Sequence, residues 1–158
     1  MSDYILVCGG GFNDKGRSVE PFDVFCHRFD NSYWPIYQNT KYRKLLREGD
    51  RIVFYVSGNK RFGGCVVAWS KIGKIVEGKK DFRAFFVAEG SVSAGNPIAY
   101  FLELSDSKRL SSPVRLKDIL GRLSFKPSNE KKWGAVLQGG CRKIAAEDYS
   151  FLTEGKVA

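Results

Sequence analysis

The chain has 158 residues, 43% of them apolar, which favours one domain with a hydrophobic core over a disordered chain. No apolar run reaches the roughly 20 residues that cross a bilayer, and residues 1–3 lack a signal-peptide pattern, so we expect a cytoplasmic protein with no membrane partner. A net charge of +9 and a pI near 9.5 indicate a polyanionic partner, most often nucleic acid.

The expected elements alternate irregularly between strands and short helices. In chain order they are a strand at 4–7, a helix at 21–29, a strand at 33–37, a helix at 41–46, strands at 51–56, 62–69, 84–88 and 98–104, helices at 116–120 and 128–137, a strand at 142–144 and a helix at 145–152. Turn residues at 57–60 predict an antiparallel hairpin. The pattern predicts an α+β fold, a small open, mainly antiparallel β-barrel with short flanking helices, spanning residues 1–153 with 154–158 as a tail or linker.

A glycine-rich stretch follows the first expected strand and lies close to a phosphate-binding loop. Gly11 and Gly16 have the spacing of that motif, but Arg17 stands where the compact ammonium of lysine is required. Pro21 would interrupt the helix that should follow, and the βαβ alternation is absent. We therefore expect these glycines to let the first strand turn sharply rather than to bind a nucleotide.

The residue types that form metal sites and catalytic relays are sparse. The cysteines Cys8, Cys26, Cys65 and Cys141 form no C-x-x-C pair, and His27 is the only histidine. We expect buried reduced thiols, no metal, no cofactor and no catalytic residues. The competing hypothesis, from another functional class, is an enzyme that acts on the bound nucleotide.

Basic residues concentrate in the middle of the chain. Residues 41–83 contain twelve lysines and arginines against four acidic residues, whereas residues 1–40 contain three against five. A solvated face is the simpler interpretation of such a run, and a phosphate-binding surface is the functional one.

Aromatic and amide side chains meet just before this basic region. Trp34 and Tyr37 precede Gln38 and Asn39. Aromatic faces hold a nucleobase by stacking, and amides offer the donor and acceptor that read its edge. A buried Trp and Tyr that pin a helix to the barrel would give the same pattern. Trp69, near a strand end, is open to both interpretations.

Three segments, in this order, carry a family resemblance: "YWPIYQN", "EGDRIVFYVSGNKRFGGCVVAW" and "QGGCRKIAAEDYSFL". They resemble EVE domains and, more distantly, YTH domains, both in the PUA-like superfamily. The resemblance implies a barrel that accepts one flipped or unpaired base in an aromatic pocket. The base-pocket residues it implies are Trp34, Tyr37, Gln38, Asn39, Ser57 and Phe62. It does not fix the second wall of the pocket, for which we choose Trp69 over the competing Phe82 and Phe86. The phosphate-binding residues that we expect are Lys41, Arg43, Lys60, Arg61 and Arg142.

The function that we expect is therefore a non-catalytic reader of a modified base, methylated cytosine or adenine, with DNA favoured over RNA. By the same resemblance it would be the targeting module of a modification-dependent restriction system, with a nuclease or motor domain in the same or a partner chain. The alternative is a PUA-like RNA-binding protein, either a reader of methylated adenine or one without modification preference.

Overall fold

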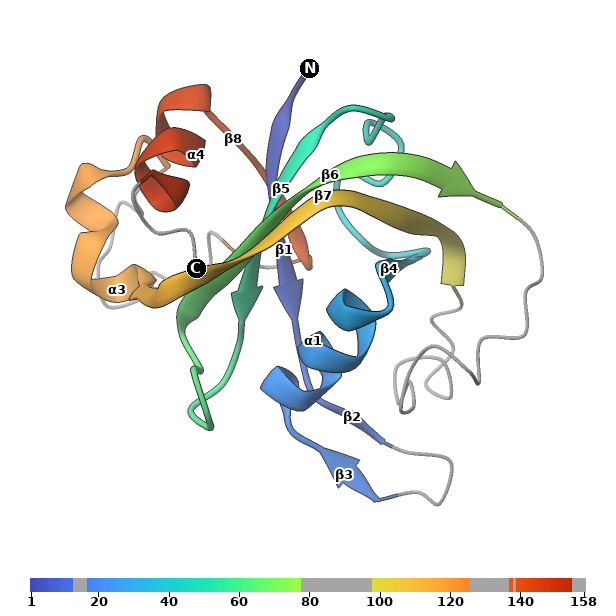
Figure 1. The fold of residues 1–158 in the computed structure, drawn as a ribbon, viewed down its shortest axis with the longest axis horizontal. Helices are drawn as coiled ribbons and strands as arrows, with labels where there is room; N and C mark the ends of the chain where they lie inside the picture. Colours follow the sequence, from blue (N-terminus) through green and yellow to red (C-terminus); the bar gives the residue numbers. More distant parts are fainter. Residues whose placement is uncertain (13–16, 78–97, 126–136, 138, 155–158) are drawn as a thin grey trace.

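A computed structural model describes residues 1–12, 17–77, 98–125, 137 and 139–154. Six strands form one sheet in the order β4-β7-β6-β5-β1-β8 (Figure 1). Their bounds are β1 (Asp3–Cys8), β4 (Tyr33–Tyr37), β5 (Arg51–Val56), β6 (Cys65–Val76), β7 (Ile98–Arg115) and β8 (Cys141–Ile144). A separate two-stranded ribbon consists of β2 (Gly11–Phe12) and β3 (Ser18–Val19).

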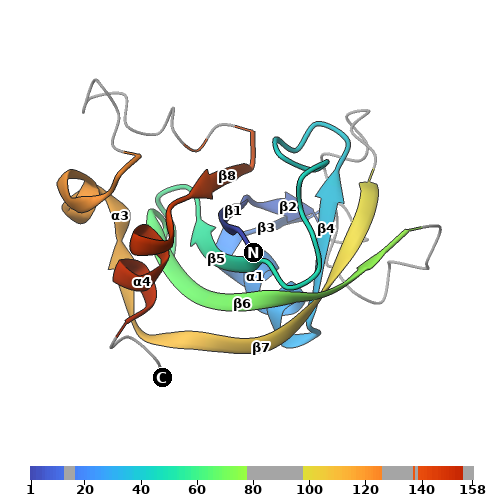
Figure 2. The same ribbon diagram turned by 90° about the horizontal axis from the view of Figure 1, so that it is seen from above.

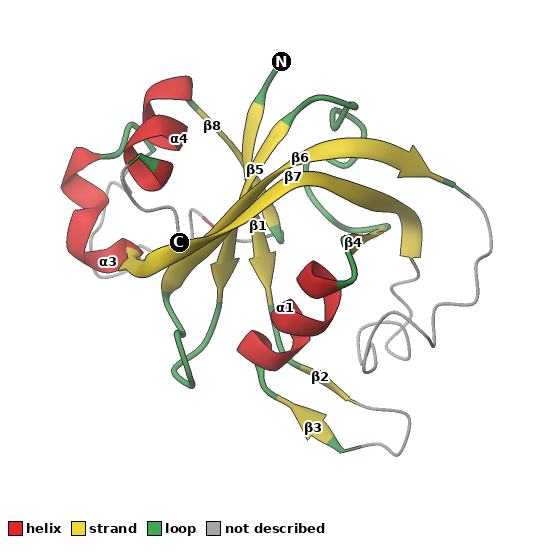
Figure 3. Ribbon diagram, viewed as in Figure 1, coloured by secondary structure: helices red, strands yellow, loops and turns green. Residues whose placement is uncertain are grey.

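Short helices flank the sheet (Figure 3). They are α1 (Pro21–Asp30), α3 (Leu116–Ile119), the 3-10 turn η2 (Leu120–Arg122) and α4 (Ala146–Thr153). None of the helices in the described part of the chain has the length and apolar character that crossing a membrane requires.

The sheet is antiparallel except at one pair of strands. β1 runs parallel to β5, with Asp3 opposite Arg51, because α1, β4 and the loop after β4 return the chain to the starting edge of β1. Viewed from above, the long strands β6 and β7 curl around the other strands, so that the sheet forms a half-barrel (Figure 2). The prediction of a small, mainly antiparallel α+β barrel is confirmed.

Strand alternation divides the interior into two cores, one on each face of the sheet. On the first face, Leu6 and Phe54 pack with Trp34 and with the apolar side of α1. On the second face, Ile5 and Val53 pack with residues of α3, η2 and α4. The sheet thus separates side chains that are neighbours in the sequence.

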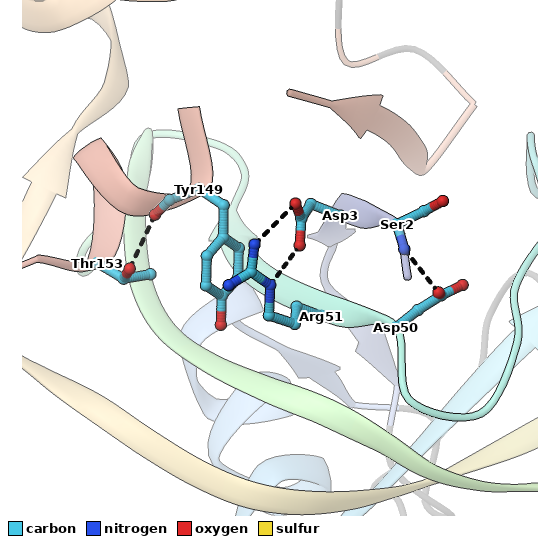
Figure 4. Close-up of polar contacts among 6 residues, drawn as sticks. All are labelled: Ser2, Asp3, Asp50, Arg51, Tyr149 and Thr153. Atoms are coloured by element: carbon cyan, nitrogen blue, oxygen red, sulfur yellow. Dashed lines mark hydrogen bonds and ion pairs between the residues drawn. The ribbon is translucent and has the colours of Figure 1, made fainter. Parts of the chain in front are cut away.

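A polar cluster ties the first residues of the chain to β5 and α4 (Figure 4). The Arg51 guanidinium donates to both carboxylate oxygens of buried Asp3, at 2.6 and 3.0 Å, and this pairing raises the pKa of Arg51. The same guanidinium lies 4.2 Å from the ring centroid of Tyr149. The Ser2 amide donates to buried Asp50 at 2.9 Å. Opposite charges in bidentate geometry hold the parallel pair in register.

Three expected elements differ from the observed ones. Residues 41–46 form successive turns instead of a helix, because Tyr42 has a φ of 62° and side chains elsewhere bind this backbone. The strands expected at 62–69 and 98–104 extend to Val76 and Arg115, since each pairs with the other along the curled edge. The strand expected at 84–88 and nearly all of the helix expected at 128–137 lie outside the described residues.

The last helix is anchored by a single buried carboxylate. Asp148, at the N3 position of α4 and 3% exposed, accepts the Ala145 amide at 3.2 Å, which is half of a capping box. It also accepts the amide of Ser124 at 2.9 Å and the hydroxyl of the same residue. Asp148 therefore joins α4 to the segment that follows η2.

Removing this carboxylate should destabilise the domain. We expect Asp148→Ala to lower the free energy of unfolding by about 2–3 kcal/mol, because hydrogen bonds to a charged acceptor are lost and buried amide donors remain. The exposed neighbour variant Glu147→Ala should cost less than about 0.5 kcal/mol. Urea unfolding followed by circular dichroism measures both, and equal losses would contradict the anchoring role.

Candidate nucleic-acid interface

A pocket of about 300 Å³ lies at the seam of the half-barrel, between β4 at one edge of the sheet and the approach to β8 at the other. We call it the seam pocket. It is lined by Leu6, Val7, Arg28, Trp34, Pro35, Ile36, Tyr37, Asn39, Thr40, Gly139 and Gly140. These residues come from β1, the last turn of α1, β4 and two loops that are distant in sequence.

Backbone hydrogen bonds close the seam. The Lys41 amide donates to the Gly139 carbonyl at 2.9 Å, and the Val7 amide donates to the Gly140 carbonyl at 2.9 Å. Both glycines have positive φ, 89° and 77°, which L side chains adopt only at a cost. A Cβ on Gly139 would lie 2.4 Å from Cγ of Lys41, so a larger residue there would also displace the exposed Lys41 side chain.

Trp34 serves both the core and the pocket. It is 2% exposed, and its ring lies 4.6 Å from Phe54 and 6.1 Å from Phe25 between centroids. The indole nevertheless contributes to the lining of the seam pocket. Trp34 is therefore a core residue that also borders the pocket, and only a small part of the indole surface is accessible.

A buried arginine forms the wall beside Trp34. Arg28 is 5% exposed, and its guanidinium carbon lies 5.1 Å from the centroid of the indole. Its Nη2 donates to the Tyr37 hydroxyl at 3.4 Å. The guanidinium thus lies against the aromatic face of Trp34 and the Tyr37 hydroxyl, and these two contacts help to orient it.

A basic groove of about 380 Å³ adjoins the seam pocket along the chain from Tyr37. Its lining residues are Gln38, Arg43, Lys44, Leu46, Arg47, Ile75, Glu77, Ala99 and Tyr100. The Arg43 Nε donates to the Gln38 carbonyl at 2.5 Å, which orients that guanidinium. The Tyr100 hydroxyl donates to the Arg43 carbonyl, and burial raises the pKa of Tyr100 to about 12, so the donor stays protonated at neutral pH.

The structure places the predicted residues Trp34, Tyr37 and Asn39 in the seam pocket, and Gln38 and Arg43 in the basic groove. Exposed Lys41 lies against Gly139, between the two. This stretch of chain thus brings a cavity and several cations together.

The hairpin between β5 and β6 forms a different surface, at the other end of α1. Phe62 is 37% exposed and meets Phe22 edge-on at 4.7 Å, and the Arg61 guanidinium lies 5.1 Å from the ring centroid of Phe22. Ser57 donates to the Cys8 carbonyl at 3.1 Å. The predicted residues Ser57, Phe62, Lys60 and Arg61 therefore do not line the seam pocket.

Two more predicted residues face the second core. Trp69 packs against that core from β6, and Arg142 lies opposite Ile5 in the sheet, with its guanidinium 5.4 Å from the ring centroid of Phe125. The sheet therefore separates them from the seam pocket. The alternatives Phe82 and Phe86 lie outside the described residues.

Sequence reasoning missed Arg28 and the glycine pair at 139 and 140. Arg28 follows Phe25 by three residues, so a cation borders the apolar side of the helix, and this was the available signal. Consecutive glycines just before a strand were the signal for a loop of positive φ. In the described part of the chain, no three His, Cys, Asp or Glu side chains gather at a position that could hold a metal ion.

The seam closure is testable without a ligand. We expect Gly139→Ala to lower the free energy of unfolding by about 1–2 kcal/mol from the left-handed backbone alone, with a further loss from displacing Lys41. Gly121→Ala is the matched control, because nothing lies within 4 Å of its added carbon, and it should be neutral or slightly stabilising. Urea unfolding of both variants checks this, and a harmless Gly139→Ala would refute the tight closure.

No family model matches the sequence, and no curated protein matches it significantly. Among solved structures, the N-terminal domain of Staphylothermus marinus McrB is similar with a TM-score of 0.61 at 10% identity, over 95% of this chain and 92% of that chain. Human THYN1, solved in complex with DNA containing 5-methylcytosine, gives 0.58 at 16% identity, over 97% and 96%. An ASCH protein from Zymomonas mobilis gives 0.58 at 14% identity, over 98% and 96%. At these identities the likeness is one of fold: the chain shares the fold of these domains, in agreement with the fold that the resemblance to EVE and PUA-like domains implies.

Proposed function

We propose that this chain is a non-catalytic reader of nucleic acid that holds one flipped or unpaired modified base in the seam pocket, with DNA favoured. The observation that carries the proposal is that one stretch of chain lines both hollows: Trp34, Tyr37 and Asn39 line the seam pocket, and Gln38, Arg43, Lys44 and Arg47 line the basic groove. A base and its flanking phosphates need this combination of an aromatic pocket and adjacent cations.

The free-energy terms that oppose and favour such binding are of similar size. Extruding a base from a duplex costs a few kcal/mol, and stacking on an aromatic side chain returns about 1–3 kcal/mol. The cations of the basic groove supply the remainder by releasing counterions from the phosphates. Because Trp34 is almost fully enclosed, stacking on it contributes only a small part of the binding free energy. Binding should therefore be favoured where the base is already unpaired.

The similar solved structures support the proposal that the ligand is DNA with a methylated base. One neighbour was solved with 5-methylcytosine DNA, and another is a domain of McrB, which supports a role as the targeting module of a modification-dependent restriction system. Methylated cytosine and methylated adenine are the candidate bases. In the non-catalytic role proposed here, a labelled oligonucleotide incubated with the protein should be recovered intact, and detectable turnover would overturn that part of the proposal.

The first prediction concerns the modified base itself. For a single-stranded oligonucleotide with one 5-methylcytosine, we expect affinity about fourfold above that for cytosine, because burying one methyl group contributes about 0.8 kcal/mol. Trp34→Phe should reduce this preference to below about twofold by shortening the pocket wall while keeping a ring against Phe54. Fluorescence anisotropy at fixed salt measures both, with N6-methyladenine and the ribose version of the same sequence as parallel ligands.

The matched control for this prediction is Trp69→Phe. Trp69 packs on the second core, across the sheet from the pocket, and its replacement should leave the preference unchanged. A Trp34→Phe variant that keeps the full preference would remove the seam pocket as the base site. Absence of binding to every oligonucleotide at low salt would remove the proposed function.

The second prediction concerns the phosphates. The double variant Lys41→Gln with Arg43→Gln should weaken binding to all sequences equally and reduce the slope of log affinity against log salt by about 2. Arg115→Gln with Lys117→Gln removes the same charges at the far end of β7 and the start of α3, so it should change the slope little. Equal effects of the two double variants would indicate nonspecific attraction by net charge.

A further inference from the structure

An exposed tyrosine stands between the seam pocket and the basic groove. Thr40 lines the pocket and Arg43 lines the groove, so Tyr42 lies at most about 7 Å of extended backbone from a residue of each. Its side chain is 37% exposed, and its ring lies 6.2 Å from the ring of Tyr4 between centroids. Leu6, two residues after Tyr4 on the same face of the sheet, lines the pocket. Tyr42 is therefore at the rim of the proposed base site.

The backbone at Tyr42 adopts a conformation that its side chain disfavours. Its φ is 62°, in the left-handed region that glycine and asparagine tolerate and that is an outlier for a bulky residue. Hydrogen bonds on both sides hold this conformation. The Lys41 amide donates to the Gly139 carbonyl at 2.9 Å, and the Tyr42 carbonyl accepts the Leu45 amide at 2.8 Å. The turn thus presents a large ring, in a fixed position, where local folding favours a small residue.

Exposed apolar surface and positive charge coincide in this turn. In the described part of the chain, the exposed large hydrophobic side chains are Met1, Tyr42, Leu45, Phe62 and Phe151. Two of these five lie within one four-residue stretch, and the same stretch of chain supplies the cations Lys41, Arg43 and Lys44. An exposed ring bordered by cations suits a single strand of nucleic acid, because the ring stacks on a base while the cations hold the phosphates. This combination favours a nucleic-acid strand over an apolar protein surface as the ligand.

We propose that Tyr42 stacks on the base adjacent to the flipped one and so fixes the strand as it passes from the seam pocket to the basic groove. This inference rests on the proposed function and adds a contact to a neighbouring nucleotide. Stacking tolerates any sequence, because every base has a π face. Tyr42 therefore contributes affinity, and the choice of the modified base is left to the pocket.

The test removes the ring and the neighbouring base separately and together. The ligand is a single-stranded oligonucleotide with one 5-methylcytosine, in which the nucleotide on the 5′ or the 3′ side is replaced in turn by an abasic residue. For the wild-type protein, one of these replacements should weaken binding at least about fivefold, the low end of what a stacked base contributes. Tyr42→Asn should weaken binding to the intact strand by a similar factor. In that variant the same abasic replacement should have almost no further effect, because both changes remove one contact.

Other readouts separate stacking from charge and from folding. Tyr42→Phe keeps the ring and should bind as the wild type does. Tyr42→Asn should keep the salt slope and the preference for 5-methylcytosine over cytosine, because it alters neither a cation nor the pocket, and a lower slope would overturn the proposal. Asparagine tolerates the positive φ, so circular dichroism should show a folded variant. Tyr42→Gly, which suits the same backbone, is the second variant without a ring if Tyr42→Asn does not fold.

Phe62→Asn is the matched control. Phe62 has the same exposed fraction, 37%, and a positive φ of 55°, but it lies on the hairpin surface, where its ring meets Phe22 edge-on at 4.7 Å. Phe62→Asn should retain the affinity of the wild type and its response to the abasic residue. Additive losses from Tyr42→Asn and the abasic residue, no loss from either abasic strand, or an equal loss from Phe62→Asn would overturn the role of Tyr42 and leave the base-reading function intact. If the wild type bound no oligonucleotide at low salt, the proposed function itself would fail.

Discussion

The candidate site depends on how the open sheet is closed. A sheet with free edges at β4 and β8 has no continuous ladder across the seam, and the loops beside these edges supply the link through the amide of Lys41 and the carbonyl of Gly139. The adjacent bond from Val7 to Gly140 extends the ladder of β1 and β8 by one step. Because two loops and not two strands meet there, the seam encloses a hollow where a complete barrel would be filled by side chains.

The side chains around this hollow belong simultaneously to the core. Trp34 contacts Phe25 and Phe54, and Arg28 holds the indole and Tyr37 from the last turn of α1. A pocket whose walls are fixed by core packing is largely preorganised, which lowers the ordering cost of binding. The same coupling means that a substitution in the wall alters stability as well as recognition, so conservative replacements and unfolding controls are needed to tell the two apart.

Local signals in the sequence predicted the elements that depend on local chemistry. The turn residues after Val56 and the apolar runs on both sides identified the hairpin of β5 and β6, and the proline and aromatic periodicity identified α1. For residues 41–46 the same reasoning predicted a helix, which does not form. There, Tyr100 binds the Arg43 carbonyl and Asp50 accepts the Arg47 amide, and such tertiary contacts override helix propensity.

The long-range pairing of the strands could not be predicted from the sequence, because it too depends on tertiary contacts. The parallel pairing of β1 with β5 joins Asp3 to Arg51 across 48 positions, and no spacing rule encodes it. Of the aromatic and amide cluster that the sequence singled out, Trp34, Tyr37 and Asn39 line the seam pocket. The opposing wall could not be inferred, because Arg28 reads as a solvent-exposed cation until the helix is docked, and the glycines at 139 and 140 reach the pocket only through the fold.

The pairing of β8 with β1 has a consequence for the order of assembly. β1 lies near the start of the chain, yet its outer neighbour, Cys141–Ile144, is synthesised more than a hundred residues later. Contacts of such high sequence separation require a large loop-closure entropy to be overcome and are typical of slow folding. On the ribosome, β1 could pair with β5 and the first core could collapse well before the glycines at 139 and 140 emerged. The cavity would then acquire its shape after the first core, and an unfinished chain could be compact and still unable to receive a ligand.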